Sequence, residues 1–156
     1  MNPFLEIVAG HPARVLAAGE FLLEQDGPCE ALHVLLEGEV EVLRDGVRVA
    51  KTADVGAVFG EMSLLLGGPC TASVRALSAS RFASIVEPRK FLAASSVASL
   101  HVAELLARRI HTLNRYLVDV KQQYEGHDHL GMVDDVLSTL MHRHPRGAAP
   151  QSGARP

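Results

Sequence analysis

The residues best suited to chemistry stand together between positions 59 and 76, which read FGEMSLLLGGPCTASVRA. A carboxylate, Glu61, follows Gly60, and a glycine turn later leads to a thiol, Cys70. Glycine lets a backbone approach a ligand closely, and the run 62–66 predicts a short helix whose free amides face an anion. This pattern indicates a site for a negatively charged ligand. A glycine-rich corner between two strands is the alternative.

The thiol in this stretch is the second feature with chemical potential. The chain has two cysteines, Cys29 and Cys70, and neither belongs to a Cys-x-x-Cys pair with histidines at zinc-ligand spacing. Free thiols are expected, and nothing in the sequence places Cys29 near Cys70. A thiol beside a helix N-terminus can have a lowered pKa and react with oxidants, so a redox sensor at Cys70 is one hypothesis.

Signatures of catalysis are missing from the sequence. It holds no Ser-His-Asp signature, no P-loop and no cluster at metal-ligand spacing. We therefore expect a binding module that is not an enzyme, with no metal and no cofactor.

Charge and length narrow the class of protein further. The net charge is −3 with neutral histidines, and the basic residues are scattered except in the final tail, so no DNA is expected to bind through this chain. No apolar stretch reaches the roughly 18 residues of a membrane span, and the start lacks a signal pattern, so we expect a cytoplasmic protein without membrane contact. Its 156 residues, 47% of them hydrophobic, suit one domain with a sizeable core.

Short strands are expected to position the stretch 59–76, which we call the corner. From Ala13 to Val86, apolar runs are broken by turn residues about every eight to twelve positions, which is typical of an antiparallel roll or barrel. Asp45-Gly46 between two alternating runs predicts a hairpin, because both residues tolerate positive φ. The predicted strands are 14–17, 21–23, 32–36, 40–42, 47–49, 71–77 and 81–86.

Beyond Val86 the apolar period changes from two to 3.6, which predicts helices. Pro88 begins a short helix to Ala94, and a long helix is predicted from about Val97 to Glu125. Apolar residues recur along it at spacings of four and three, so we expect it to pair with a second copy of itself; packing on its own barrel is the alternative. The predicted dimer seam is Leu106, Ile110, Leu113, Leu117, Val120 and Tyr124.

The chain is therefore divided into a domain over 1–125 that includes the dimerisation helix, and a segment over 126–156. In that segment we expect one short helix at 132–141 and a disordered tail from His144 to Pro156.

The stretch 59–76 resembles the corner of the cyclic nucleotide-binding domains of catabolite activator proteins, kinase regulatory regions and nucleotide-gated channels. The similarity covers about 12–125, since GEFLLEQDGPCEALHVLLEGEVEVLRDG and ARRIHTLNRYL resemble the family's roll and long helix. It implies a jelly-roll-like β-roll followed by a short and a long helix, without a DNA-binding domain. It also implies cAMP or cGMP as the ligand.

The resemblance assigns ligand contacts residue by residue. Glu61 matches the family's acceptor of the ribose 2′-hydroxyl, and Asn114 and Arg109 match helix positions that reach toward the base and the ribose. The implied site comprises Phe59, Gly60, Glu61, Met62, Ser63, Cys70, Thr71, Ala72, Arg109 and Asn114.

The chain departs from the family at Cys70, where nucleotide-binding members carry the arginine that pairs with the cyclic phosphate. Arg109 and, less well, Arg75 are the candidate substitutes, because Arg75 lies at an odd offset along its strand. Two functions stay open: a sensor that signals a cyclic nucleotide through its dimer or a protein partner, and a degenerate dimeric scaffold that binds no nucleotide.

Overall fold

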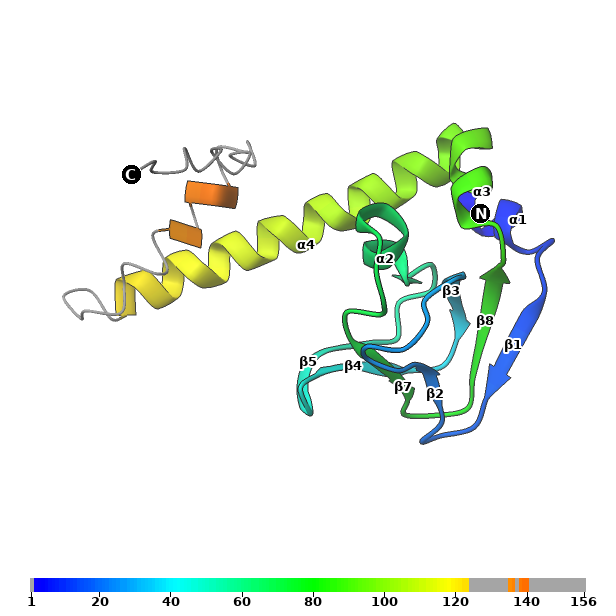
Figure 1. Ribbon diagram of the computed structural model, residues 1–156, viewed down its shortest axis with the longest axis horizontal. Coiled ribbons are helices and arrows are strands. Elements are labelled where there is room, and N and C mark those ends of the chain that lie inside the picture. The colour runs from blue at the N-terminus through cyan, green and yellow to red at the C-terminus, as the bar shows by residue number, and fades with distance from the viewer. Residues whose placement is uncertain (1, 124–134, 137, 141–156) are drawn as a thin grey trace, which may run out of the picture. The chain divides into compact units, whose positions relative to one another are not determined.

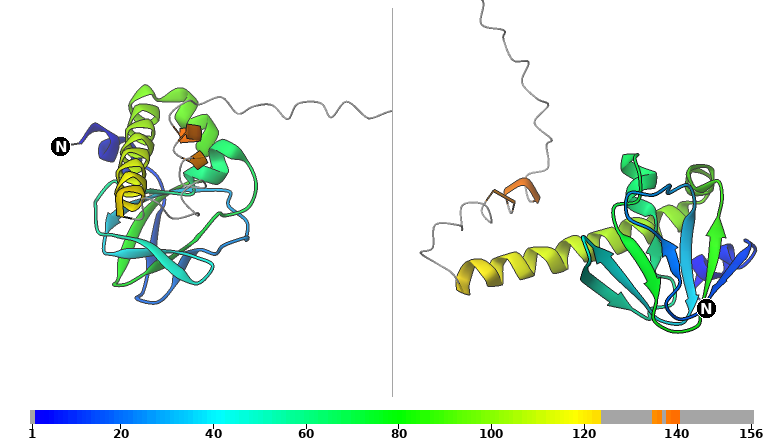
Figure 2. Two further views of the ribbon diagram at one scale, coloured as in Figure 1. Left: turned by 90° about the vertical axis from the view of Figure 1, so that its left-hand side faces the viewer. Right: turned by 60° about the horizontal axis from the view of Figure 1, so that its bottom comes forward.

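The computed structural model describes residues 2–123, 135, 136 and 138–140. The chain divides into two compact units, residues 1–105 and 106–156, and the division falls inside the long helix. Each unit is described by itself (Figures 1 and 2).

The first unit is a β-roll with helices at its two chain ends, which confirms the predicted fold class. Its described strands form two four-stranded antiparallel sheets, ordered β1-β8-β3-β6 and β2-β7-β4-β5. The elements are α1 (Pro3–Val8), β1 (Ala13–Leu16), β2 (Phe21–Leu23), β3 (Leu32–Glu37), β4 (Val40–Arg44), β5 (Val47–Thr52), β6 (Val58–Phe59), α2 (Glu61–Leu66), β7 (Ser73–Ala76), β8 (Ser80–Ile85), α3 (Pro88–Ala94) and α4 (Ser96–Gln123).

Alternation along the strands builds the core inside the roll. Side chains two residues apart share a face, so Val74 and Ala76 of β7 point inward together. The interior cluster is Leu16, Leu22, Leu23, Leu35, Val40, Ala57, Phe59, Cys70, Val74, Ala76 and Phe82. The candidate corner therefore contributes two of its own residues, Phe59 and Cys70, to this core.

The sheet β1-β8-β3-β6 is buried on both faces: the face that points away from the interior cluster is also shielded from water. Val34 and Ala83 are fully buried on this face. Phe4 of α1 stacks on the His101 ring of α4 with 3.7 Å between ring centroids, and His101 Nε2 is 2.9 Å from the carbonyl oxygen of Gly56. We attribute the burial of this face to these two helices.

The turn chemistry agrees with the predicted hairpin. Asp45 and Gly46 have φ values of 52° and 77°, and they join β4 to β5. The other strands lie where predicted within a few residues, except that β7 begins at Ser73, so Thr71 and Ala72 precede it. α1 and the two-residue β6 were not predicted.

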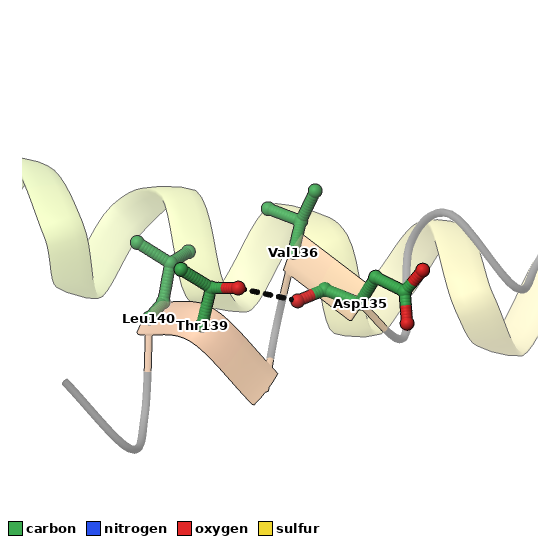
Figure 3. Close-up of a pocket in the computed structure, with 4 residues that line it drawn as sticks. All are labelled: Asp135, Val136, Thr139 and Leu140. Carbon is green, nitrogen blue, oxygen red and sulfur yellow. Dashed lines mark hydrogen bonds between the residues drawn. The ribbon is translucent and has the colours of Figure 1, made fainter. Parts of the chain in front are cut away.

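In the second unit the structure describes the rest of α4, up to Gln123, and the helical residues 135, 136 and 138–140. A hollow of about 250 Å³ is lined by Asp135, Val136, Thr139 and Leu140, and the Thr139 hydroxyl donates to the Asp135 carbonyl at 2.9 Å (Figure 3). These residues fall within the helix predicted at 132–141, whose remaining residues, like Tyr124 and the tail 144–156, lie outside the described part. Within the described part no single helix is long and apolar enough to cross a membrane, and only the bent pair α3 and α4 meets that test by length and composition.

Candidate functional site

The corner begins where β6 ends, at a residue that only glycine fits. Gly60 has φ 91° and immediately precedes α2. A Cβ atom built on Gly60 would lie 2.7 Å from the Ala31 carbonyl oxygen and 3.7 Å from Cys29 Sγ. The loop between β2 and β3 therefore lies directly against the start of α2.

Glu61 and Ser63, both predicted site residues, are buried in α2. Glu61 is only 5% exposed, and the Ser63 hydroxyl donates to the Pro69 carbonyl at 2.7 Å. This hydrogen bond joins the start of α2 to the turn that follows it. The structure thus brings Glu61 and Ser63 into one compact corner with Phe59, whose ring contacts Phe82 edge-on at 6.3 Å between centroids.

Two further predicted site residues are more open to water. Met62 is exposed on α2, and Thr71 is exposed just before β7, while Ala72 beside it is half-buried. The predicted residues 59–63 and 70–72 therefore belong to one corner, but Met62 lies away from its buried side.

Cys70 lies after the turn that follows α2, and it is only 1% exposed. Its amide donates to the Gly27 carbonyl at 2.9 Å, its thiol donates to the Pro28 carbonyl at 3.5 Å, and its carbonyl accepts from the Asp26 amide at 2.8 Å. Burial, together with the neighbouring Cys29 thiol, raises the pKa of Cys70 to about 12. The hypothesis of a Cys70 thiol with a lowered pKa is therefore wrong: the side chain lies in the water-excluding core, which disfavours the thiolate.

Arg75 does not replace the missing arginine. It lies on the outer face of β7, opposite Glu41 of β4, and forms an ion pair with that carboxylate. Arg48 pairs with the same carboxylate at 2.6 Å. The Glu41 side chain is only 2% exposed, and its hydrogen bond from Arg48, followed by that from Arg75, lowers its pKa. Arg75 therefore neutralises a buried acid on the outside of the roll.

His33 is a buried polar residue beside the corner that the sequence did not single out. It pairs in register with Phe59 of β6, and its Nδ1 is 2.8 Å from the Ser84 hydroxyl oxygen. Burial, and secondarily the positive charge of Arg14, lowers the pKa of His33 to about 4. The imidazole is therefore neutral at physiological pH.

A hollow of about 270 Å³ opens beside the loop that contacts the corner. Gly27 and Pro28 line it together with residues of β1 and β2, among them Arg14, and with Glu24. Because the positive charge of Arg14 and the negative charge of Glu24 both line this hollow, its lining does not favour an anion.

A family model described as "Cyclic nucleotide-binding domain" matches residues 13–93, more than half of the chain. The chain belongs to the cyclic nucleotide-binding domain family. The match includes the whole corner from Phe59 to Ala72, so the corner described above is that of a cyclic nucleotide-binding domain.

Curated relatives match shorter stretches. The chain is 42% identical over 65 residues to an uncharacterized ABC transporter ATP-binding protein of Mycobacterium bovis, covering 39% of this chain and 20% of the relative. It is 38% identical over 61 residues to the cGMP-dependent protein kinase egl-4 of Caenorhabditis briggsae, covering 39% and 8%. A cAMP-dependent protein kinase regulatory subunit of Emericella nidulans is 40% identical over 60 residues, covering 38% and 15%. The chain thus spans a fifth or less of each relative.

Solved structures agree on the fold of the cyclic nucleotide-binding domain. The catabolite activator protein of Thermus thermophilus has a TM-score of 0.61 at 21% identity, covering 91% of this chain and 82% of that one. A cyclic nucleotide-binding domain from Methylobacillus flagellatus has a TM-score of 0.61 at 25% identity, covering 69% and 66%.

The remaining predicted residues lie on α4 in the second unit. Arg109 and Asn114 are in this helix, as are the seam residues from Leu106 to Val120, of which Leu113 is 44% exposed. Their roles in ligand binding and dimerisation stay predictions. Among the described residues no group of three or more His, Cys, Asp or Glu side chains could hold a metal ion.

Proposed function

We propose that this domain is a regulatory module that binds a cyclic nucleotide, cAMP or cGMP, against the corner 59–72 and signals through a dimer or a protein partner. The observation that carries the proposal is the buried Glu61 carboxylate directly after the positive-φ Gly60. A carboxylate accepts strong hydrogen bonds from hydroxyl groups, which suits the ribose 2′-hydroxyl. Relatives named for cGMP and cAMP match part of this chain, which supports the same class of ligand.

Binding of the cyclic phosphate should be weak, because Cys70 offers a neutral thiol where an arginine is expected. A charge-assisted hydrogen bond contributes about 1.5 to 3 kcal/mol, so its loss weakens affinity roughly ten- to a hundred-and-fifty-fold. The backbone amides of Thr71 and Ala72 are the groups proposed to contact the phosphate. Arg109 and Asn114 keep their proposed roles toward the ribose and the base.

A second function, a dimeric scaffold that binds no nucleotide, is favoured by one observation. Cys70 is part of the apolar core cluster, and its thiol is in contact with protein groups on the β2–β3 loop. If this packing leaves no room for a phosphate, the domain would retain the family fold without the ligand.

Calorimetric titration of the reduced protein separates the two functions. The ligands are cAMP, cGMP and 2′-deoxy-cAMP, which lacks the hydroxyl proposed to contact Glu61. The proposal predicts measurable heat with at least one cyclic nucleotide and weaker binding of the deoxy analogue. In Glu61→Gln, the difference between cAMP and 2′-deoxy-cAMP should shrink, because the charged acceptor is gone.

The scaffold is supported instead if the folded parent protein gives no heat with any of the three nucleotides at millimolar concentration. A thermal melt of Glu61→Gln serves as the control for folding, since Glu61 is buried.

A further inference from the structure

Two thiols that lie far apart in the sequence meet at the corner. Cys29 follows the turn after β2, and Cys70 follows the glycine turn after α2. The Cys29 side chain is half-buried and packs against the core cluster that contains Cys70. The neighbouring Cys29 thiol also contributes, after burial, to the raised pKa of Cys70.

The surrounding backbone holds the two segments in register. Two hydrogen bonds join the segments, from the Asp26 amide to the Cys70 carbonyl at 2.8 Å and from the Cys70 amide to the Gly27 carbonyl at 2.9 Å. The Cys70 thiol also donates to the carbonyl of Pro28, the residue directly before Cys29. On the other side, Cys29 Sγ lies beside Gly60, since a Cβ at Gly60 would be 3.7 Å from that sulfur, an ordinary van der Waals distance.

We propose that Cys29 and Cys70 form an oxidisable dithiol that hydrogen peroxide converts into an intramolecular disulfide. Both cysteines are free thiols in the structure. The disulfide would join the β2–β3 loop covalently to the turn between α2 and β7, and so fix the two sides of the corner. Its formation depends on the packing of Cys29 against the core cluster that contains Cys70, and not on nucleotide binding.

The order of the two steps follows from exposure. Cys29 is half-buried and open to a small oxidant, whereas Cys70 is buried in the core and protonated. In the first step the Cys29 thiolate attacks peroxide: an S–O bond forms, the O–O bond breaks, and the hydroxide that leaves takes up a proton to become water.

In the second step the Cys70 sulfur attacks the Cys29 sulfenic acid. The S–S bond forms, the S–O bond breaks, and the oxygen leaves as water with the proton of Cys70. In sum, two thiols and one peroxide give one disulfide and two waters, and the two electrons lost by the sulfurs reduce the peroxide.

The test is to treat the folded, full-length protein with hydrogen peroxide, remove the oxidant, unfold the protein and alkylate the remaining thiols. Mass spectrometry should show a monomer lighter by two hydrogens with no alkyl group, whereas the untreated protein carries two. Trypsin should then give a crosslink between peptides 15–44 and 52–75, each of which holds one cysteine. The disulfide closes a long loop, so the oxidised protein should melt at a temperature higher by roughly 5 °C or more.

The two single variants test the order of the steps. In Cys29→Ser, Cys70 should keep its thiol under the same treatment and accept one alkyl group after unfolding. In Cys70→Ser, Cys29 should give a sulfenic acid that dimedone traps.

Three results would overturn the proposal: two alkylated thiols in the treated wild-type protein, a disulfide found only between two copies of the chain, or oxidation of Cys70 in Cys29→Ser at the wild-type rate. None of these measurements involves a nucleotide, so the disulfide and the proposed ligand stand or fall separately.

Discussion

The carbonyl oxygen of Ala31 lies so close to Gly60 that a Cβ atom at that glycine would come within 2.7 Å of it. Gly60 also adopts a φ of 91°, in the region that residues with a side chain rarely occupy. The start of α2 and the β2–β3 loop therefore depend on a missing side chain for their contact.

The first prediction is that Gly60→Ala lowers the free energy of unfolding by about 1 to 3 kcal/mol, since it combines backbone strain with a clash against backbone. Urea denaturation followed by circular dichroism measures this loss. Gly10→Ala is the matched control, because a Cβ there meets nothing within 4 Å and the φ is not positive. Equal stability of the two variants would show that the loop does not contact the corner as described.

The second prediction concerns pH and His33. Its pKa falls from 6.5 to about 4 on folding, so the unfolded chain binds the proton more tightly, and stability is present above pH 6.5 and lost as the pH falls toward 4. Between pH 7 and pH 5 the loss from this residue should be about 1 to 2 kcal/mol.

Urea denaturation of the wild type and of His33→Gln at pH 7 and pH 5 isolates this effect, because glutamine keeps a polar group near Ser84 but does not titrate. The variant should lose less stability than the wild type over this interval. An identical loss in both proteins would mean that His33 is not the residue responsible.

Local chemistry was enough to predict the parts of the fold that depend on a few neighbouring residues. The turn at Asp45-Gly46 is one example, since both residues were expected to adopt positive φ and both do. Alternation also predicted that Val40 and Glu41 face opposite sides of their strand. It did not predict that Glu41 is buried, because Arg48 and Arg75 cover it from two other strands.

Contacts between distant segments explain what the sequence did not reveal. The short helix α1 has only a brief local signal in the sequence, the Asn2 cap followed by proline. Its Phe4 ring stacks on His101, which lies almost a hundred residues later in the chain. The meeting of Cys29 and Cys70 likewise depends on how the roll closes. The expectation of a lowered Cys70 pKa was wrong, because it took account of the nearby helix N-terminus, which lowers a thiol pKa, and not of burial in the core, which raises it.

The third prediction tests the proposed dimer seam on α4. The double variant Leu113→Glu, Leu117→Glu should convert a dimer into a monomer, because charges at adjacent seam positions would be buried between two helices. Sedimentation equilibrium measures the mass. Val118→Glu is the matched control, since Val118 is exposed on the same helix outside the predicted seam. A wild-type monomer, or a dimer that survives the double substitution, would contradict the seam.

The fourth prediction concerns the affinity for a cyclic nucleotide, which we expect Cys70 to lower. Arginine at this position would supply the cation for a cyclic phosphate, while without ligand it would leave a charge in the core, which is destabilising. Cys70→Arg should therefore melt at a lower temperature than the parent and recover stability on addition of cAMP or cGMP. Cys70→Met, which adds bulk without charge, should show no such recovery.

The most direct measurement of the central claim, that this corner is shaped for a cyclic nucleotide, is calorimetric titration of Cys70→Arg beside the parent with cAMP and cGMP. The account predicts that the variant binds one of them at least about tenfold more tightly than the parent does. A folded Cys70→Arg protein that binds neither nucleotide more tightly than the parent would contradict it.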